Sequence, residues 1–190
     1  MSLLTTPSQT VGPFFGFGLS WPDGPHVVPA GAPGGFWIRG RVLDGAGVPV
    51  PDALIETWQA DPRGRFATAD EADPASTFRG FARSGTDREG FFGVFTVKPG
   101  RVPAPAHRAP GGVELQAPHV AVTVLARGLL NRVVTRIYFA DEPTANAEDP
   151  VLASLPDPSR RATLLAAVAS DGYSFDIHLQ GEHETVFFAF

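Results

Sequence analysis

Residues 119–126 read HVAVTVLA, and residues 133–139 read VVTRIYF. Both runs are rich in β-branched residues, which fit the pleated, half-buried surface of a sheet. The first run ends at Arg127-Gly128, and a glycine at such a point is a turn signal. We therefore interpret the two runs as consecutive β-strands.

Similar runs recur along the chain, and Gly, Pro and Asp turn signals separate them. They predict further strands at residues 36–43, 53–59, 90–97, 174–180 and 185–190. About seven strands with little helix between them are typical of an antiparallel sandwich. The expected fold class is therefore all-β: an antiparallel β-sandwich with one short helix and long loops.

The one helix that the sequence predicts lies after residue 156. Asp157 can cap its start, and Pro158 suits its first position. Asp171-Gly172 would stop it. The apolar residues that would share one of its faces are Leu164, Leu165 and Val168.

The first 35 residues differ in composition from the rest of the chain. They are rich in Pro and Gly, which interrupt regular structure, yet they carry several large apolar side chains. We interpret residues 1–35 as an N-terminal arm that packs on its own core or on another chain. Residues 36–190 are expected to form a single β-sandwich domain, since 190 residues suit one domain better than two.

Composition excludes several kinds of function. The net charge is −5 and no basic run stands out, so nucleic acid and anionic membranes are poor partners. The sequence contains no cysteine, which excludes disulfides, thiol catalysis and thiolate metal sites. No apolar run approaches the ~20 residues of a membrane span. The start MSLLTTPSQT lacks the features of a secretion signal, so we expect a cytoplasmic protein.

A set of short motifs begins at residue 51. In order, they are PDALIETWQA at 51–60, GRF at 64–66, FRGFAR at 78–83, TDREG at 86–90 and TVKPG at 96–100. Their order and spacing resemble the intradiol ring-cleavage dioxygenases. Further segments extend the resemblance from Thr6 to the C-terminus and narrow it to the alpha chains of protocatechuate 3,4-dioxygenases. These segments include TPSQTVGPF at 6–14, LARG at 125–128 and QGEHETVFF at 180–188.

The resemblance implies where a metal would sit. Iron-bearing chains of the family hold ferric iron with two Tyr and two His, and ferric iron favours anionic oxygen completed by imidazole. The matching positions here are Phe66, Val102, His119 and Ala121. Three of these four ligands are absent, and Tyr138 and Tyr173, the only tyrosines, lie far from any His pair. We therefore expect no metal site on this chain, although carboxylates from distant parts of the sequence stay open as ligands.

The resemblance also implies a partner. That partner would be a homologous beta subunit that carries Fe(III), assembled with this chain in a larger hetero-oligomer. Together they would cleave protocatechuate with O2 to give 3-carboxy-cis,cis-muconate. This chain would contribute no catalytic residue and would be inactive alone.

Two parts of the chain are implied to reach the partner's substrate. Thr10, Gly12, Pro13 and Phe14 would line its pocket, with Gly12 allowing close backbone approach and Pro13 stiffening the arm. The alternative is a surface loop anchored by one buried Phe. Arg127 would face the substrate carboxylate, which a guanidinium matches with two parallel hydrogen bonds. The alternative for Arg127 is an ordinary salt bridge.

Two other functions stay open from the sequence. A non-catalytic β-sandwich that binds or supports other molecules could share the fold, because a fold does not fix a function. A stand-alone ring-cleaving enzyme with unusual iron ligands is the second. Purification from the native host distinguishes them, since the first would elute without a homologous partner and the second would be coloured and active alone.

Overall fold

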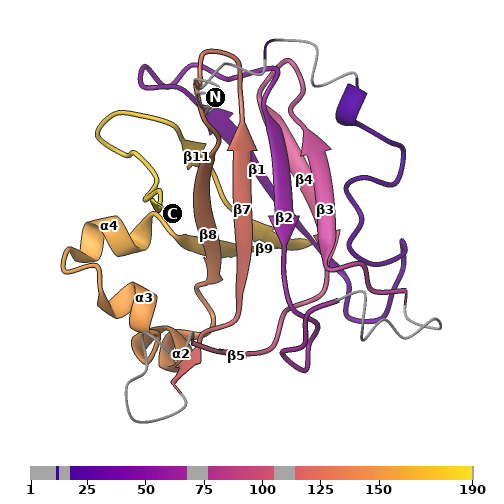
Figure 1. The fold of residues 1–190 in the computed structure, drawn as a ribbon, viewed down its shortest axis with the longest axis vertical. Coiled ribbons are helices and arrows are strands. Elements are labelled where there is room, and N and C mark those ends of the chain that lie inside the picture. Colours follow the sequence, from indigo (N-terminus) through magenta and orange to yellow (C-terminus); the bar gives the residue numbers. More distant parts are fainter. Residues whose placement is uncertain (1–11, 13–17, 68–76, 105–113, 190) are drawn as a thin grey trace, which may run out of the picture.

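A computed structural model gives the fold and describes residues 12, 18–67, 77–104 and 114–189 (Figure 1). Two layers of strands lie face to face. The front layer has the order β3 (Phe81–Gly85), β2 (Leu54–Trp58), β7 (His119–Leu125) and β8 (Val133–Phe139), with antiparallel neighbours throughout. The rear layer is built around β1, with β4, β10 and β11 beside it; their bounds are Phe36–Leu43, Phe91–Thr96, Gly172–Ser174 and Ile177–His178.

Strand β9 (Leu165–Ala169) belongs to both layers. Its first two residues pair with the end of β8 in the front layer, and its last three pair with β10 in the rear layer. A separate ribbon, β5 (Val102–Pro103) with β6 (Leu115–Gln116), lies at one end of the front layer. The helices described are short: α2 (Pro143–Ala147), α3 (Pro150–Ala153) and α4 (Pro158–Ala162).

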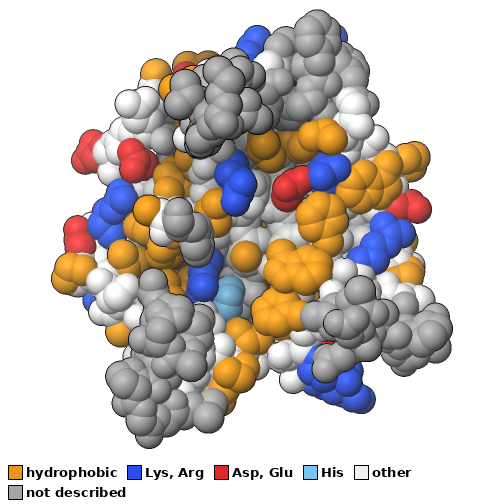
Figure 2. Space-filling view, viewed as in Figure 1, with side chains coloured by type: hydrophobic (Ala, Val, Ile, Leu, Met, Phe, Trp, Pro, Cys, Tyr) orange, Lys and Arg blue, Asp and Glu red, His pale blue; other side chains and the backbone are white. Residues whose placement is uncertain are grey.

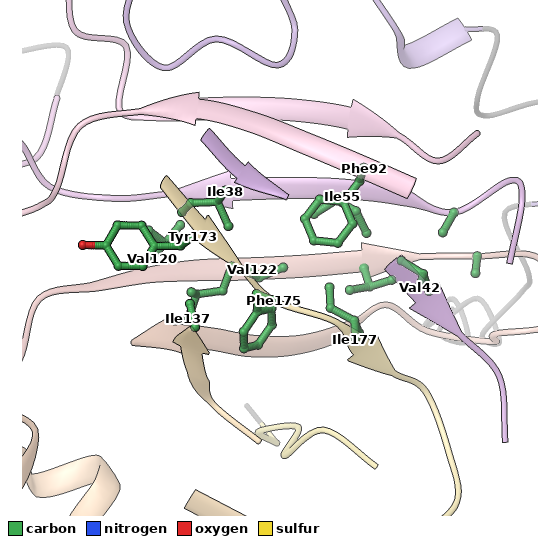
Figure 3. Packing of buried hydrophobic residues seen from close by; sticks show 14 of the residues in the cluster. Ile38, Val42, Ile55, Phe92, Val120, Val122, Ile137, Tyr173, Phe175 and Ile177 are labelled. Atoms are coloured by element: carbon green, nitrogen blue, oxygen red, sulfur yellow. The ribbon is translucent and has the colours of Figure 1, made fainter. Parts of the chain in front are cut away.

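Alternation along the strands builds the core between the layers. In β7, Val120, Val122 and Val124 are fully buried, while the residues between them are only partly buried. Successive side chains of a strand point to opposite faces, so one face of β7 lines the core and the other is turned outward. Residues of both layers meet in this core, as Figure 3 shows for Ile55 of the front layer and Phe92 of the rear layer.

The all-β prediction is confirmed, and the strands expected at 36–43 and 133–139 have the observed bounds of β1 and β8. The sheets are mixed, however, because β1 pairs in parallel with β10 and β11, and β8 pairs in parallel with β9. The strand expected at 174–180 is interrupted at Phe175 and Asp176. The Asp176 carboxylate accepts a hydrogen bond from the backbone N–H of Arg41 at 2.8 Å.

The predicted helix is correct only in its first turn. Asp157 accepts a hydrogen bond from the backbone N–H of Ser159, and Pro158 occupies the first position, but α4 ends at Ala162. The residues after Leu164 form β9 instead of continuing the helix. Ala166 is fully buried in the core, so tertiary pairing overrides local helix preference there.

Two other expectations about secondary structure were wrong. The prediction of one helix is wrong because α2 and α3 also form; they span 5 and 4 residues, too few to show helical periodicity in a sequence. The strand expected at 185–190 is absent from residues 185–189, while residue 190 lies outside the described residues. That segment makes single backbone hydrogen bonds, such as the one from the N–H of Phe188 to the carbonyl of Val134 at 2.8 Å.

The described part of the N-terminal arm packs on the domain. Val27 is fully buried against Ala82 and Val94. Backbone hydrogen bonds join Val27 and Pro25 to Phe95 of β4, at 2.9 and 2.8 Å. In the parts of the chain that the structure describes, no helix has the length and apolar character needed to cross a membrane.

Candidate functional site

The outer face of the front layer brings together the positions that match the family's iron ligands. In the strand register, Trp58 lies opposite Ala121, and Ala121 lies opposite Arg136. His119, two residues before Ala121 on the same face, lies opposite Tyr138. The two paired His positions of the family thus fall on one face of β7, with β2 and β8 on either side.

The other two positions lie beside this face. The Phe66 ring stacks on the Trp58 ring, with the centroids 6.1 Å apart and the planes at 5°. Val102 is buried in β5, where it pairs with Gln116 of β6. Gly64 lets the loop before Phe66 approach the backbone next to Val102. Its φ is 77°, and a Cβ there would lie 2.2 Å from the carbonyl oxygen of Arg101.

The side chains at these positions do not fit ferric iron. Phe66, Val102 and Ala121 present only hydrocarbon, which offers a metal no lone pair, and His119 supplies one imidazole. Among the described residues, no three or more His, Asp or Glu side chains gather in an arrangement that could hold a metal ion. No step of a reaction is therefore assigned to iron on this chain.

His119 has a structural setting. Its Nδ1 lies 2.8 Å from the carbonyl oxygen of Ala117, so Nδ1–H donates a hydrogen bond to that oxygen. Burial, and secondly the charge of Arg136, lower the pKa of His119 to about 4. The imidazole is consequently neutral near pH 7, and its tautomer is fixed by a backbone contact.

A buried polar network lies next to His119. Arg136 Nη1 donates to the side-chain oxygen of Gln116 at 2.6 Å and to the hydroxyl oxygen of Tyr138 at 3.2 Å. The Tyr138 hydroxyl donates to Asp149 Oδ1 at 3.3 Å, and burial raises the pKa of Tyr138. Asp149 is fully buried and accepts a hydrogen bond from the backbone N–H of Ala117 at 2.7 Å. The network holds β6, β8 and the start of α3 together.

Asp149 also fixes the local fold around this network. Its Oδ1 accepts hydrogen bonds from the backbone N–H groups of Val151 and Leu152, at 2.8 and 2.9 Å, and so caps α3. No role was predicted for Asp149 or Arg136 from the sequence. The signal for Asp149 was the pair Asp149-Pro150, an N-cap followed by proline, which is the same signal that located α4.

Arg127 lies at the opposite end of β7 from His119. Eight residues separate them, which corresponds to about 26 Å along a strand. The Arg127 side chain is 60% exposed, and its Nε forms an ion pair with Asp52 Oδ2 at 2.9 Å. The structure therefore does not bring Arg127 to the metal-like positions of its own chain, and it shows the ion pair that was the alternative interpretation.

The arm residues expected at the partner's substrate can be located only in part. Gly12 is described, with a φ of 70°, a backbone conformation that glycine adopts without steric cost. Thr10, Pro13 and Phe14 lie outside the described residues.

Comparison with known proteins shows which family the chain resembles. The family model for dioxygenases matches residues 12–181. The chain is 42% identical to the protocatechuate 3,4-dioxygenase alpha chain of Burkholderia cepacia, over 98% of each chain. It is 33% identical to the beta chain from the same species, over 78% of this chain and 65% of that one. The dioxygenase domain of a carbohydrate-binding fusion protein from Streptomyces sp. SirexAA-E superposes with a TM-score of 0.59 and 29% identity, covering 93% of this chain and 98% of that domain. The chain therefore belongs to the intradiol ring-cleavage dioxygenase family, and over its full length it is similar to an alpha chain of that family.

Proposed function

We propose that this chain is the iron-free alpha subunit of a protocatechuate 3,4-dioxygenase. It would complete the substrate pocket of a homologous beta chain, and the pair would cleave protocatechuate with O2 to 3-carboxy-cis,cis-muconate. The observation that carries the proposal is the outer face of the front layer, where three of the four ligand positions hold Phe66, Val102 and Ala121. Full-length similarity to an alpha chain, and weaker similarity to the beta chain of the same species, support it.

The division of labour follows from the side chains. Ferric iron in the beta chain would supply the chemistry that lets the aromatic diol react with O2. This chain would supply Arg127 for the substrate carboxylate. Asp52 pairs with the Nε of Arg127, and a bidentate contact with the substrate carboxylate would use the two Nη groups. The arm would supply Thr10, Gly12, Pro13 and Phe14 as a wall of the pocket.

Reconstitution tests the proposal directly. The chain alone should bind no stoichiometric iron and show no ring cleavage. Co-expression with an iron-bearing homologue should give one co-eluting complex that cleaves protocatechuate, most informatively with the partner encoded beside it. Ring cleavage or tyrosinate colour from the chain alone, or elution without any partner, would refute it. We keep the cytoplasm as the expected location of the complex, which cell fractionation would check.

Arg127→Ala tests the assignment of the substrate carboxylate. Loss of a charge-assisted hydrogen bond costs roughly 1.5–3 kcal/mol, so kcat/KM for protocatechuate should fall about tenfold to a hundredfold. Catechol, which lacks the carboxylate, should lose far less. Arg88→Ala is the matched control, because Arg88 is also an exposed arginine in a turn. Equal losses for both substrates would show that Arg127 does not recognise the carboxylate.

A further inference from the structure

Aromatic side chains gather on the outer face of the front layer. Trp58 and Phe66 are each 38% exposed and stack on each other. Phe81 of β3 lies opposite Trp58 in the strand register. We call Trp58, Phe66 and Phe81 the aromatic platform. Figure 2 shows hydrophobic side chains gathered over this part of the face. An exposed apolar patch of this kind is typical of a surface that binds another molecule.

Ala121 leaves room beside the platform. It lies between Trp58 on β2 and Arg136 on β8, and its side chain is a single methyl group. Neighbouring strands are about 4.8 Å apart, so the backbones of Trp58 and Arg136 are about 9.6 Å apart. Ala121 lies between them, and we call it the low position because its side chain is short. That separation suits one aromatic ring lying over Ala121.

Arg136 brings a charge to this place that has no carboxylate partner among the described residues. Its hydrogen bonds go to the amide oxygen of Gln116 and the hydroxyl of Tyr138, which are both neutral. Other arginines differ: Arg83 pairs with Glu56, and Arg101 pairs with Glu148. Partial burial removes water from a guanidinium, which costs free energy. Charge-assisted hydrogen bonds to a bound anion would offset that cost.

The carboxylate in the same hydrogen-bond network belongs to Asp149. Asp149 accepts hydrogen bonds from the hydroxyl of Tyr138 and from three backbone N–H groups, those of Ala117, Val151 and Leu152. His119 is neutral near pH 7 and so adds no second charge. The Asp149 oxygens contact the Tyr138 hydroxyl and backbone N–H groups, and Arg136 is the charged donor that lies opposite Ala121 in the strand register.

We propose that this face binds a small aromatic carboxylate, with the carboxylate at Arg136 and the ring over Ala121 against Trp58 and Phe66. The aromatic rings contribute ring-to-ring contact, and the guanidinium selects the anion. Because these positions hold no set of metal ligands, the acid would be bound and not turned over. This inference concerns the chain's own face and does not depend on the assignment of Arg127.

Benzoate is the probe for this site. The full-length chain is titrated with benzoate, and binding is followed by calorimetry and by tryptophan fluorescence. Benzamide, which keeps the ring but has no charge, should bind at least tenfold more weakly. Cyclohexanecarboxylate, which keeps the charge but not the aromatic ring, should bind several-fold more weakly. Absence of heat and of fluorescence change up to the solubility limit of benzoate would overturn the proposal, as would equal binding of all three compounds.

Ala121→Leu and Arg136→Gln localise the binding. Leucine fills the low position while the guanidinium keeps its partners, so Ala121→Leu should weaken benzoate binding at least tenfold. Arg136→Gln should do the same, and Arg132→Gln, at an exposed arginine in the preceding loop, should leave binding unchanged. If Arg136→Gln fails to fold, Ala121→Leu decides. Unchanged benzoate binding by Ala121→Leu would show that the acid binds elsewhere.

The same comparison works in the complex. If the chain is soluble only with its partner, complexes carrying wild-type or Ala121→Leu chain are titrated in parallel. Benzoate sites in the partner are common to both complexes, so the proposal requires one fewer site in the variant. An equal number of sites in the two complexes would overturn it.

Discussion

His119 retains an imidazole at a position where the family places a ligand, yet its surroundings suit a neutral ring. Its Nδ1–H donates to the Ala117 carbonyl, and burial, followed by the neighbouring guanidinium of Arg136, opposes a second proton by lowering the pKa. A ring in such a setting contributes packing and one hydrogen bond. It also makes stability depend on pH.

The pH dependence follows from the lowered pKa of His119. In the unfolded chain the imidazole titrates near 6.5, but in the folded chain its pKa is about 4. As the pH falls from 6.5 to 4, the unfolded chain takes up the proton first, so the free energy of unfolding decreases. The contribution is present in full above pH 6.5 and amounts to about 1 to 3 kcal/mol. Below about pH 4 it is lost.

His119→Gln isolates this effect, because glutamine keeps an N–H donor but does not titrate. Denaturant unfolding at pH 7 and pH 4.5 should show a smaller loss of stability on acidification for the variant than for the wild type. The carboxylates are the same in both proteins, so their contribution to the loss of stability cancels in the comparison. Identical losses would mean that the His119 pKa is not lowered in the folded chain.

At this scale residue type alone limits which side chains can bind iron, but it does not reveal the environment of the residues. Phe66, Val102 and Ala121 could be recognised as unsuitable ligands from residue type alone. The partners of Arg136 and the burial of Asp149 could not, because they depend on contacts between β6, β8 and α3 that are distant in sequence. Arg127 was located correctly at the end of a strand, but its partner Asp52 lies 75 residues away.

Local signals located some elements well and others poorly. The N-cap at Asp157 was predicted because capping involves only neighbouring residues. The conversion of the following segment to β9 was not predicted, since its pairing partners are β8 and β10. Strand β3 was missed because FARSG contains few strong strand formers, and its pairing with β2 determines its conformation.

Gly40 shows how tightly two elements can approach. The link between β10 and β11 crosses β1 at this residue, and a Cβ on Gly40 would lie 1.7 Å from the carbonyl oxygen of Phe175. Backbone must move to admit even one methyl group. Gly40→Ala should therefore cost roughly 3 kcal/mol or more in the free energy of unfolding.

Gly85→Ala is the control for this prediction, because a Cβ at Gly85 would meet no atom within 4 Å. It should change the free energy of unfolding by less than about 1 kcal/mol. Thermal and denaturant unfolding of the two variants provide the comparison. Similar stabilities would show that the β10–β11 link can move away from β1 at little cost.

For the whole molecule, the fold is expected to tolerate loss of the first 14 residues better than the activity does. Packing of the described arm onto the domain involves Val27, which lies well beyond the deletion. Removing residues 1–14 should therefore leave the melting temperature of the complex nearly unchanged. If the arm lines the substrate pocket, kcat/KM for protocatechuate should fall by tenfold or more. Unchanged kinetics would show that the arm is no part of the pocket.

The sharing of β9 between the layers has a mechanical consequence. Strand β9 is hydrogen-bonded to both sheets, so it connects the two layers of the sandwich covalently as well as through pairing. Separating the front sheet from the rear one must break the hydrogen bonds of β9 to either β8 or β10. Because the same five residues pair with both strands, the loss of one pairing also disturbs the other. The two sheets should therefore open together, as one cooperative unit.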